Sequence, residues 1–216
     1  MPQAFSPASV LVIKLASLAG LALVVGAIFV ARWRMTPAAA VGAPVDQPIR
    51  FSHAHHVGDD GIDCRYCHAT VETSAFAGMP STQVCLDCHS QLFVDAPELA
   101  PLWKSLREER PLRWNRVHDL PDFVYFDHSI HVAKGVPCQE CHGRVDRMPL
   151  LWREASLDMQ WCLACHRDAE HHVRPRSEEF AMTDAAAPTA AEVQKLLRER
   201  PLQDVRRLTD CSTCHR

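Results

Sequence analysis

The sequence predicts a mainly α-helical protein with much irregular structure, in which one apolar N-terminal helix precedes a domain without a large side-chain core. Three observations support this prediction: apolar residues concentrate in the first thirty positions, 15 prolines interrupt the chain, and all 10 cysteines recur in one short motif. The formal net charge of −3 and the lack of a basic stripe give no support to a nucleic-acid partner. A group other than packed side chains therefore has to organise most of the molecule.

Every cysteine belongs to a CxxC pair that is followed at once by a histidine. The motifs are, in chain order, CRYCH (Cys64, Cys67, His68), CLDCH (Cys85, Cys88, His89), CQECH (Cys138, Cys141, His142), CLACH (Cys162, Cys165, His166) and CSTCH (Cys211, Cys214, His215). The two thiols of such a pair add to the vinyl groups of one porphyrin, and the following histidine supplies an axial nitrogen to the iron. The sequence therefore predicts five covalently bound haem c groups.

Zinc is the main alternative for the same cysteines. The first and second motifs, like the third and fourth, have the C-x2-C-x15–20-C-x2-C spacing of a zinc ribbon. Zinc does not require a histidine after every pair, however, and it leaves Cys211 and Cys214 without a partner pair. A disulfide framework explains neither the fixed spacing nor the histidines. The pattern therefore favours haem.

The apolar N-terminal run predicts a single transmembrane helix at about residues 8–31. This run contains roughly 20 apolar residues, interrupted only by Lys14, which is enough to cross a bilayer. Trp33, between two arginines, ends it like an interfacial belt. A cleaved signal peptide is the alternative, because residues 38–40 offer a small-residue cleavage site. The run is longer than a usual signal segment, so we expect residues 1–36 to form an uncleaved membrane anchor.

The charges around this helix give a conflicting orientation. Arg32 and Arg34 follow the apolar run, whereas Lys14 and the amino terminus lie at its start, so the positive-inside rule alone would place the remaining domain in the cytoplasm. Haem c is attached on the outer face of the cytoplasmic membrane, and two arginines are a weak topological signal. We therefore expect a single-pass protein with its haem domain in the periplasm.

An internal repeat follows a Pro/Ala-rich linker at residues 37–48. FSHAHHV (51–57) precedes the first two motifs, and FDHSIHV (126–132) precedes the third and fourth. The periplasmic domain, residues 49–216, is thus expected to contain two di-haem units at about 51–95 and 126–172, with the fifth haem at 211–215.

Two helices are expected outside the motifs. Residues 98–110 have apolar positions at helical spacing and end before Pro111. Thr189 and Glu192 form a capping box for a helix that runs to about Arg200. The sequence favours equally that these helices shield haem edges and that they pack one apolar stripe on the surface.

Histidines outside the motifs supply candidates for the distal iron ligands. The repeat selects four of them by alignment, and a fifth lies just ahead of the second repeat: His53, His56, His128, His131 and His118. Each haem would then have two histidine ligands.

The remaining candidates are expected to have other roles. His55 breaks the repeat alignment, which favours a contact with solvent or a propionate. His171 and His172 lie in a polar run and are interpreted as surface residues, with His172 as the reserve ligand. Met79 and Met148 are each followed by proline and are interpreted as packing residues, although methionine ligation would raise a haem potential.

The FxHxxH…CxxCH arrangement resembles the small multihaem cytochromes c typified by the tetrahaem proteins of sulfate reducers. This resemblance implies that the first histidine of each pair serves the haem that follows, and that the second reaches a different haem. Over about residues 8–216, the anchor, the five motifs and the segments WNRVHDLPDFVYFDHSIHV, MPSTQVCLDCH, LDMQWCLACHR and LTDCSTCHR resemble the pentahaem cytochrome subunit of alternative complex III.

The second resemblance implies an electron-transfer subunit of a respiratory quinol oxidoreductase in the bacterial cytoplasmic membrane, without catalytic residues of its own. Implied partners are an iron–sulfur subunit related to molybdopterin enzymes, integral quinol-binding subunits and a monohaem cytochrome c. Electrons would pass from the iron–sulfur partner to a cytochrome c or terminal oxidase. The His171-His172 pair is not expected in that family. A free-standing quinol dehydrogenase and a multihaem reductase are alternatives, and five distal histidines argue against both.

Overall fold

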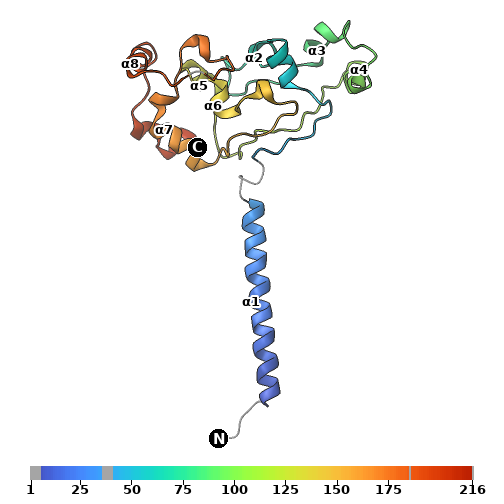
Figure 1. The fold of residues 1–216 in the computed structure, drawn as a ribbon, viewed down its shortest axis with the longest axis vertical. Coiled ribbons are helices and arrows are strands. Elements are labelled where there is room, and N and C mark those ends of the chain that lie inside the picture. Colours follow the sequence, from blue (N-terminus) through green and yellow to red (C-terminus); the bar gives the residue numbers. More distant parts are fainter. Residues whose placement is uncertain (1–5, 36–40, 185, 216) are drawn as a thin grey trace. The chain divides into compact units, whose positions relative to one another are not determined.

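The computed structural model describes residues 6–35, 41–184 and 186–215, which form one long helix, many short helices and irregular segments (Figure 1). Within these residues the β structure is limited to two isolated bridges, Val41 with Arg153 and Pro44 with Trp152. The chain divides into two compact units, Met1–Ala40 and Val41–Arg216. The prediction of a mainly helical fold with much irregular structure is confirmed.

The first unit contains one long helix, α1 (Pro7–Met35), drawn in blue in Figure 1. Its 29 residues extend about 43 Å at 1.5 Å per residue, more than the roughly 30 Å hydrocarbon core of a bilayer. An 18-residue stretch within Pro7–Trp33 has a mean hydropathy of 2.3, and none of that stretch is buried. Helix α1 is thus long and apolar enough to cross a membrane, a property that N-terminal signal sequences share.

The second unit consists of short helices. In chain order they are η2 (Ala54–Asp59), α2 (Cys64–Cys67), α3 (Thr82–His89), η3 (Pro97–Leu99), α4 (Ala100–Glu108), α5 (His128–Ala133), α6 (Cys138–His142), η4 (Val145–Arg147), α7 (Met159–Arg167), η5 (Ala169–His172), η6 (Arg176–Glu178), α8 (Ala190–Glu199), α9 (Val205–Leu208) and α10 (Cys211–Cys214). Each CxxC pair therefore lies on its own short helix.

The two helices expected outside the motifs are present as α4 and α8. Helix α8 begins with the expected capping box, in which the Glu192 amide donates to the Thr189 hydroxyl and the Glu192 carboxylate accepts from the Thr189 amide. Helix α4 ends at Glu108, because Glu109 adopts a left-handed backbone conformation with φ of 51°. Both helices bury one side, through Leu102 on α4 and through Val193 and Leu196 on α8.

The side-chain core of the second unit is small. The buried apolar residues of the described chain are Val71, Leu86, Leu102, Val132, Val145, Met148, Leu150, Val173, Val193 and Leu196. They are spread over many helices instead of forming one contiguous layer of large side chains. A chain of this size needs further apolar contacts to hold so many short helices together, which agrees with the expectation of a domain organised around bound groups.

The predicted linker is only partly described, because residues 37–40 lie outside the described residues. From Val41 onward the structure holds this segment against the second unit. The Gly42 amide donates to the Arg153 carbonyl at 2.8 Å, and the Val45 amide donates to the Leu151 carbonyl at 3.1 Å. Gln47 exchanges two further hydrogen bonds with the backbone of Asn115. Residues 41–48 are thus part of the domain, since their backbone groups pair with it.

Candidate functional site

The CxxCH motifs are numbered here as sites 1 to 5 in chain order. At sites 1, 4 and 5 the helix begins at an aspartate whose carboxylate accepts a backbone N–H: Asp63 from Arg65, Asp158 from Trp161 and Asp210 from Ser212. Residues three and four apart on a helix share one face. The helix therefore presents the two cysteines and the histidine of a motif on one side, as attachment to a single flat ring requires.

Three motif histidines lie opposite a histidine of the internal repeat. The ring centroids are 6.1 Å apart for His56 and His89, 6.3 Å for His128 and His142, and 6.1 Å for His131 and His166. A metal about 2 Å from a nitrogen on each side holds two opposed imidazoles with centroids roughly 6 Å apart. These separations fit one haem iron between each pair. The structure thus brings together one predicted proximal and one predicted distal ligand at sites 2, 3 and 4.

Hydrogen bonds at Nδ1 orient most of these rings. Seven histidines have Nδ1 within 2.7–3.1 Å of a backbone carbonyl oxygen: His56, His68, His89, His128, His131, His166 and His215. A carbonyl only accepts, so Nδ1 carries a proton, and in the neutral ring the lone pair is then on Nε2. This is the pattern of metal-binding histidines, in which a hydrogen bond at one nitrogen fixes the other toward the metal.

The carbonyl that orients His68 depends on a glycine. Gly78 has φ of 85°, a conformation that side chains rarely adopt, and a Cβ there would lie 2.9 Å from the Thr70 hydroxyl. Its carbonyl oxygen lies 2.8 Å from His68 Nδ1. A glycine is thus required for the backbone to reach the proximal histidine of site 1.

The two repeat units have the same local geometry. Phe51 stacks on His56 with centroids 4.3 Å apart and meets His53 edge-on at 4.9 Å. Phe126 stacks on His131 at 4.5 Å and meets His128 edge-on at 4.8 Å. In each di-haem repeat, one phenylalanine ring thus packs against both histidines.

By this correspondence, His53 is the distal partner expected for His68 at site 1. Burial is the main cause that lowers the pKa of His53 to about 4, and the charge of His68 is the second cause. Its Nδ1 is buried and has no hydrogen-bond partner among the described residues. The ring is therefore neutral and is held by packing on Phe51, as an iron ligand at this position requires.

His118 lies beside the proximal histidine of site 3. Its Nε2 is 3.3 Å from His142 Nδ1, and the ring centroids are 4.2 Å apart. Burial lowers the pKa of His118 to about 4 and that of His142 to about 3, so both rings are neutral. The ring of His215 contacts that of Phe123, with centroids 5.9 Å apart. Among the described residues it makes no ring contact with another histidine. The assignment of His118 as fifth distal ligand stays a prediction.

The histidines not expected to be ligands have acidic neighbours. His55 is exposed and lies 3.6 Å from Asp59 and 3.5 Å from Asp60. His172 Nδ1 is 2.5 Å from the carboxylate of Glu140, inside the site 3 motif, and its side chain is only 29% exposed. His172 thus makes a contact that its polar surroundings in the sequence did not predict.

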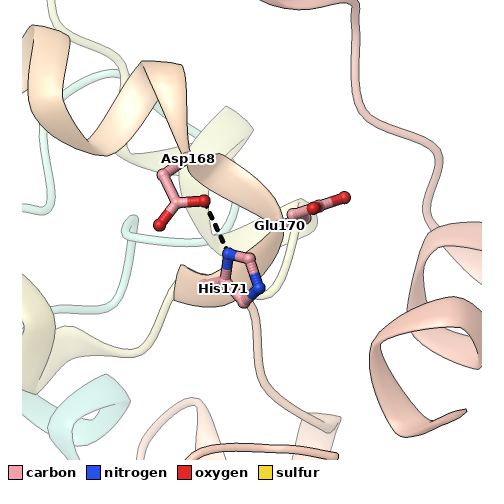
Figure 2. Close-up of side chains that lie close together, drawn as sticks. All are labelled: Asp168, Glu170 and His171. Carbon is pink, nitrogen blue, oxygen red and sulfur yellow. Dashed lines mark hydrogen bonds and ion pairs between the residues drawn. The ribbon is translucent and has the colours of Figure 1, made fainter. Parts of the chain in front are cut away.

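His171 lies on the surface, as expected. Figure 2 shows it beside Asp168 and Glu170, with Nδ1 2.6 Å from the Asp168 carboxylate. The hydrogen bond to Asp168 raises the pKa of His171. These three exposed residues are the only group within the described chain whose His, Cys, Asp or Glu ligand atoms converge closely enough for a metal ion. Within the described chain, no four cysteines lie close enough together to hold a zinc ion as in a zinc ribbon.

None of the ten cysteines, which all lie within the described residues, forms a disulfide. The side chains of Cys64 and Cys138, from sites 1 and 3, interact, which lowers the pKa of Cys64 and raises that of Cys138. Burial and then the charge of Cys165 raise the pKa of Cys141 to about 12. The histidine that follows each pair, rather than the titration of the thiols, is what favours haem over zinc at these cysteines.

The methionines agree with their interpretation as packing residues. Met148 is 1% exposed and its carbonyl accepts a hydrogen bond from the Ala54 amide at 3.1 Å. Met79 is half exposed. Neither observation calls for a methionine ligand.

Glu179 is a positioning residue that the sequence did not reveal. Its side chain is 1% exposed and forms ion pairs with Arg176 and Arg200. Its carbonyl accepts from the Cys138 amide at 3.0 Å, and the next carbonyl, of Phe180, lies 3.9 Å from Cys64 Sγ. A buried acidic residue thus fixes the backbone between sites 1 and 3. It lies in a polar run without a motif, so only its burial identifies it.

Comparisons with known proteins agree with this site. Residues 124–216 match the family described as cytochrome c7 and related cytochrome c. The chain is also 34% identical over 146 residues to the "menaquinone reductase, multiheme cytochrome c subunit" of Nitratidesulfovibrio vulgaris (strain Hildenborough). This alignment covers 67% of the chain and 63% of that relative, so the chain spans less than two thirds of the relative's length.

Proposed function

We propose that this chain, whose second unit is a multihaem cytochrome c domain, is the electron-transfer subunit of a membrane quinol oxidoreductase complex. Electrons pass through five c-type haems, from an iron–sulfur partner to a cytochrome c or terminal oxidase. The chain carries electrons and is not itself the enzyme that transforms quinol.

The opposed histidine pairs carry this proposal. Centroid separations of 6.1–6.3 Å support a histidine ligand on both faces of an iron at sites 2, 3 and 4. A haem with two fixed protein ligands has no open position for a substrate and changes its coordination little when an electron arrives or leaves. Such sites suit electron transfer and do not suit reduction of a bound oxyanion.

The proposed haem sites use the motif and repeat residues in fixed roles. The ten motif cysteines form thioethers, and the five motif histidines are proximal ligands. His53, His56, His128 and His131 serve sites 1, 2, 3 and 4 respectively, and His118 is the proposed fifth distal ligand. The Nδ1 hydrogen bonds support the ligand role of seven of these histidines.

Helix α1 is proposed as a single-pass anchor in the bacterial inner membrane, with the haem domain in the periplasm. Its length and apolar composition support the anchor, and the chemistry of haem c attachment supports the orientation. The relative's name describes a subunit, which supports assembly with other chains. We propose the partners of alternative complex III: an iron–sulfur subunit related to molybdopterin enzymes, integral quinol-binding subunits and a monohaem cytochrome c.

Electron direction separates two candidate functions. The resemblance to alternative complex III favours quinol oxidation, whereas the relative is named for reduction of menaquinone. The test is to purify the intact complex in mild detergent, identify its subunits by mass and mix it with a quinol while haem absorbance is followed. Quinol oxidation predicts rapid haem reduction by the complex and none by the isolated chain.

Two results would contradict the proposal. Haems that are reduced only by a periplasmic donor and are reoxidised by quinone would assign the reverse direction. Purification of the chain without any other subunit would instead favour a free-standing quinol dehydrogenase.

A further inference from the structure

We infer that the five haem sites form one unbranched row in the order 2, 1, 3, 4, 5, so that sites 2 and 5 are the ends of the electron path. The inference rests on the proposed haem c content of the motifs and goes beyond it, because the order differs from the chain order. It follows from contacts made by residues within or next to each motif.

Sites 1 and 2 are neighbours because their motifs contact each other. Tyr66, inside CRYCH, donates its hydroxyl to the carboxylate of Asp87, inside CLDCH, at 2.9 Å. The proposed distal ligands of these sites, His53 and His56, are only three residues apart and pack on the same Phe51 ring. Sites 1 and 2 therefore share both a motif contact and a ligand segment.

Sites 3 and 4 are related in the same way. His128 lies opposite His142, and His131 lies opposite His166, so the single short helix α5 serves both sites. Glu140, inside the site 3 motif, also pairs with His172, six residues beyond the site 4 histidine. One turn of helix thus fixes the two sites side by side.

Sites 1 and 3 join the two halves of the row. The consecutive carbonyls of Glu179 and Phe180 contact the Cys138 amide and the Cys64 thiol. Because each of these cysteines attaches one edge of its haem, the edges at sites 1 and 3 approach at this junction. Among the described residues, no hydrogen bond or ion pair joins the motif of site 2 to that of site 3.

Site 5 follows site 4. His166 Nδ1 lies 2.8 Å from the carbonyl of Leu208, three residues before Cys211, and helices α7 and α9 pack together. Among the described residues, no hydrogen bond or ion pair joins the site 5 motif to that of site 1 or site 2. The contacts therefore extend the row at site 4 and do not close it into a ring.

This order defines the electron path. An electron that enters at one end passes each site in turn. Every transfer oxidises one site and reduces the next by one electron, and no bond is made or broken. The step between sites 1 and 3, at the junction of Cys64 and Cys138, is then obligatory, since it is the link between the two repeats.

Distal-ligand variants of the full-length chain in detergent test the order. Methionine in place of a distal histidine raises the potential of that haem. That haem is then reduced, and so carries one positive charge fewer, while its neighbours titrate, and adjacent haems feel this difference most strongly. His56→Met alters an end site, so we expect one further haem to shift its potential. His131→Met alters an internal site, so two further haems should shift. Redox titration followed by electron paramagnetic resonance resolves the individual haems.

The matched control is His55→Met, next to His56 but exposed and outside the predicted ligand set, which should shift none. Two or more shifted neighbours for His56→Met, or only one for His131→Met, would overturn the row. Because a variant can lose a haem, the wild-type chain gives a second measurement: iron positions from cryo-electron microscopy. A site 2 iron closer to site 3 than to site 1 would also overturn it. Neither measurement needs a quinol or a partner, so failure of the order is distinguishable from failure of the proposed function.

Discussion

Among the proximal histidines, His142 has an unusual hydrogen-bond partner. The other four place Nδ1 against backbone carbonyls, of Gly78, Leu92, Leu208 and Phe123. His142 instead lies against the side chain of His118. A backbone carbonyl can be replaced only by changing the fold, whereas a side-chain partner can be removed by one substitution. His118 is thus the residue at which the ligand assignment is most directly accessible to mutation.

As the fifth distal ligand, His118 is expected to be essential for one low-spin haem. His118→Ala should keep all five haems attached, because thioethers and proximal histidines remain, and should turn one haem in five high-spin. Electron paramagnetic resonance measures the spin state, with His55→Ala as a control that changes nothing. A His118→Ala protein with five low-spin haems and one shifted potential would assign His118 to the hydrogen bond with His142 instead. A high-spin signal in His172→Ala would identify the reserve ligand.

Short helices carry all five motifs, and those of sites 1, 4 and 5 begin at an aspartate. The motif spacing, the repeat and the capping box of α8 were predictable because each involves residues within a few positions of one another. Three other contacts were not predictable: that of Tyr66 with Asp87, that of Glu179 with two arginines, and that of the segment 41–48 with residues 151–153. These contacts join residues distant in sequence, and neither composition nor periodicity reports them.

The cap of α7 gives a stability prediction at this scale. The hydrogen bond from the Trp161 amide holds the pKa of Asp158 below its usual value. A carboxyl whose pKa is lower in the folded state stabilises above its unfolded value, and this contribution is lost as pH falls through the folded value. Asp158→Ala should lower the free energy of unfolding by about 1 kcal/mol at pH 7.

Guanidinium unfolding at several pH values measures this effect. Asp158→Asn is the control, because asparagine also caps helices but carries no charge. It should lower the free energy of unfolding at pH 7 by less than Asp158→Ala does. This difference from the wild type should vanish in acid, where Asp158 is itself protonated and uncharged. A loss for Asp158→Asn that is unchanged in acid would show that the carboxylate charge does not act there.

For the whole molecule, covalent cofactors replace the missing core. Ten buried apolar side chains are spread over the second unit, and the motifs supply the attachment points between them. The sequence predicted the haem sites, because attachment needs a fixed local spacing. It did not predict the proposed order of the sites, because the contact of Cys64 with Phe180 and that of His166 with Leu208 join segments that are distant in sequence.

The haem content of the purified full-length chain tests the central claim most directly. A pyridine haemochrome assay, scaled to protein mass, should return five haem c groups per chain, and Cys211→Ala combined with Cys214→Ala should return four. Intact mass under denaturing conditions should increase by the same number of haems, since thioethers survive denaturation. A value near two haems, or bound zinc in place of haem, would contradict the account.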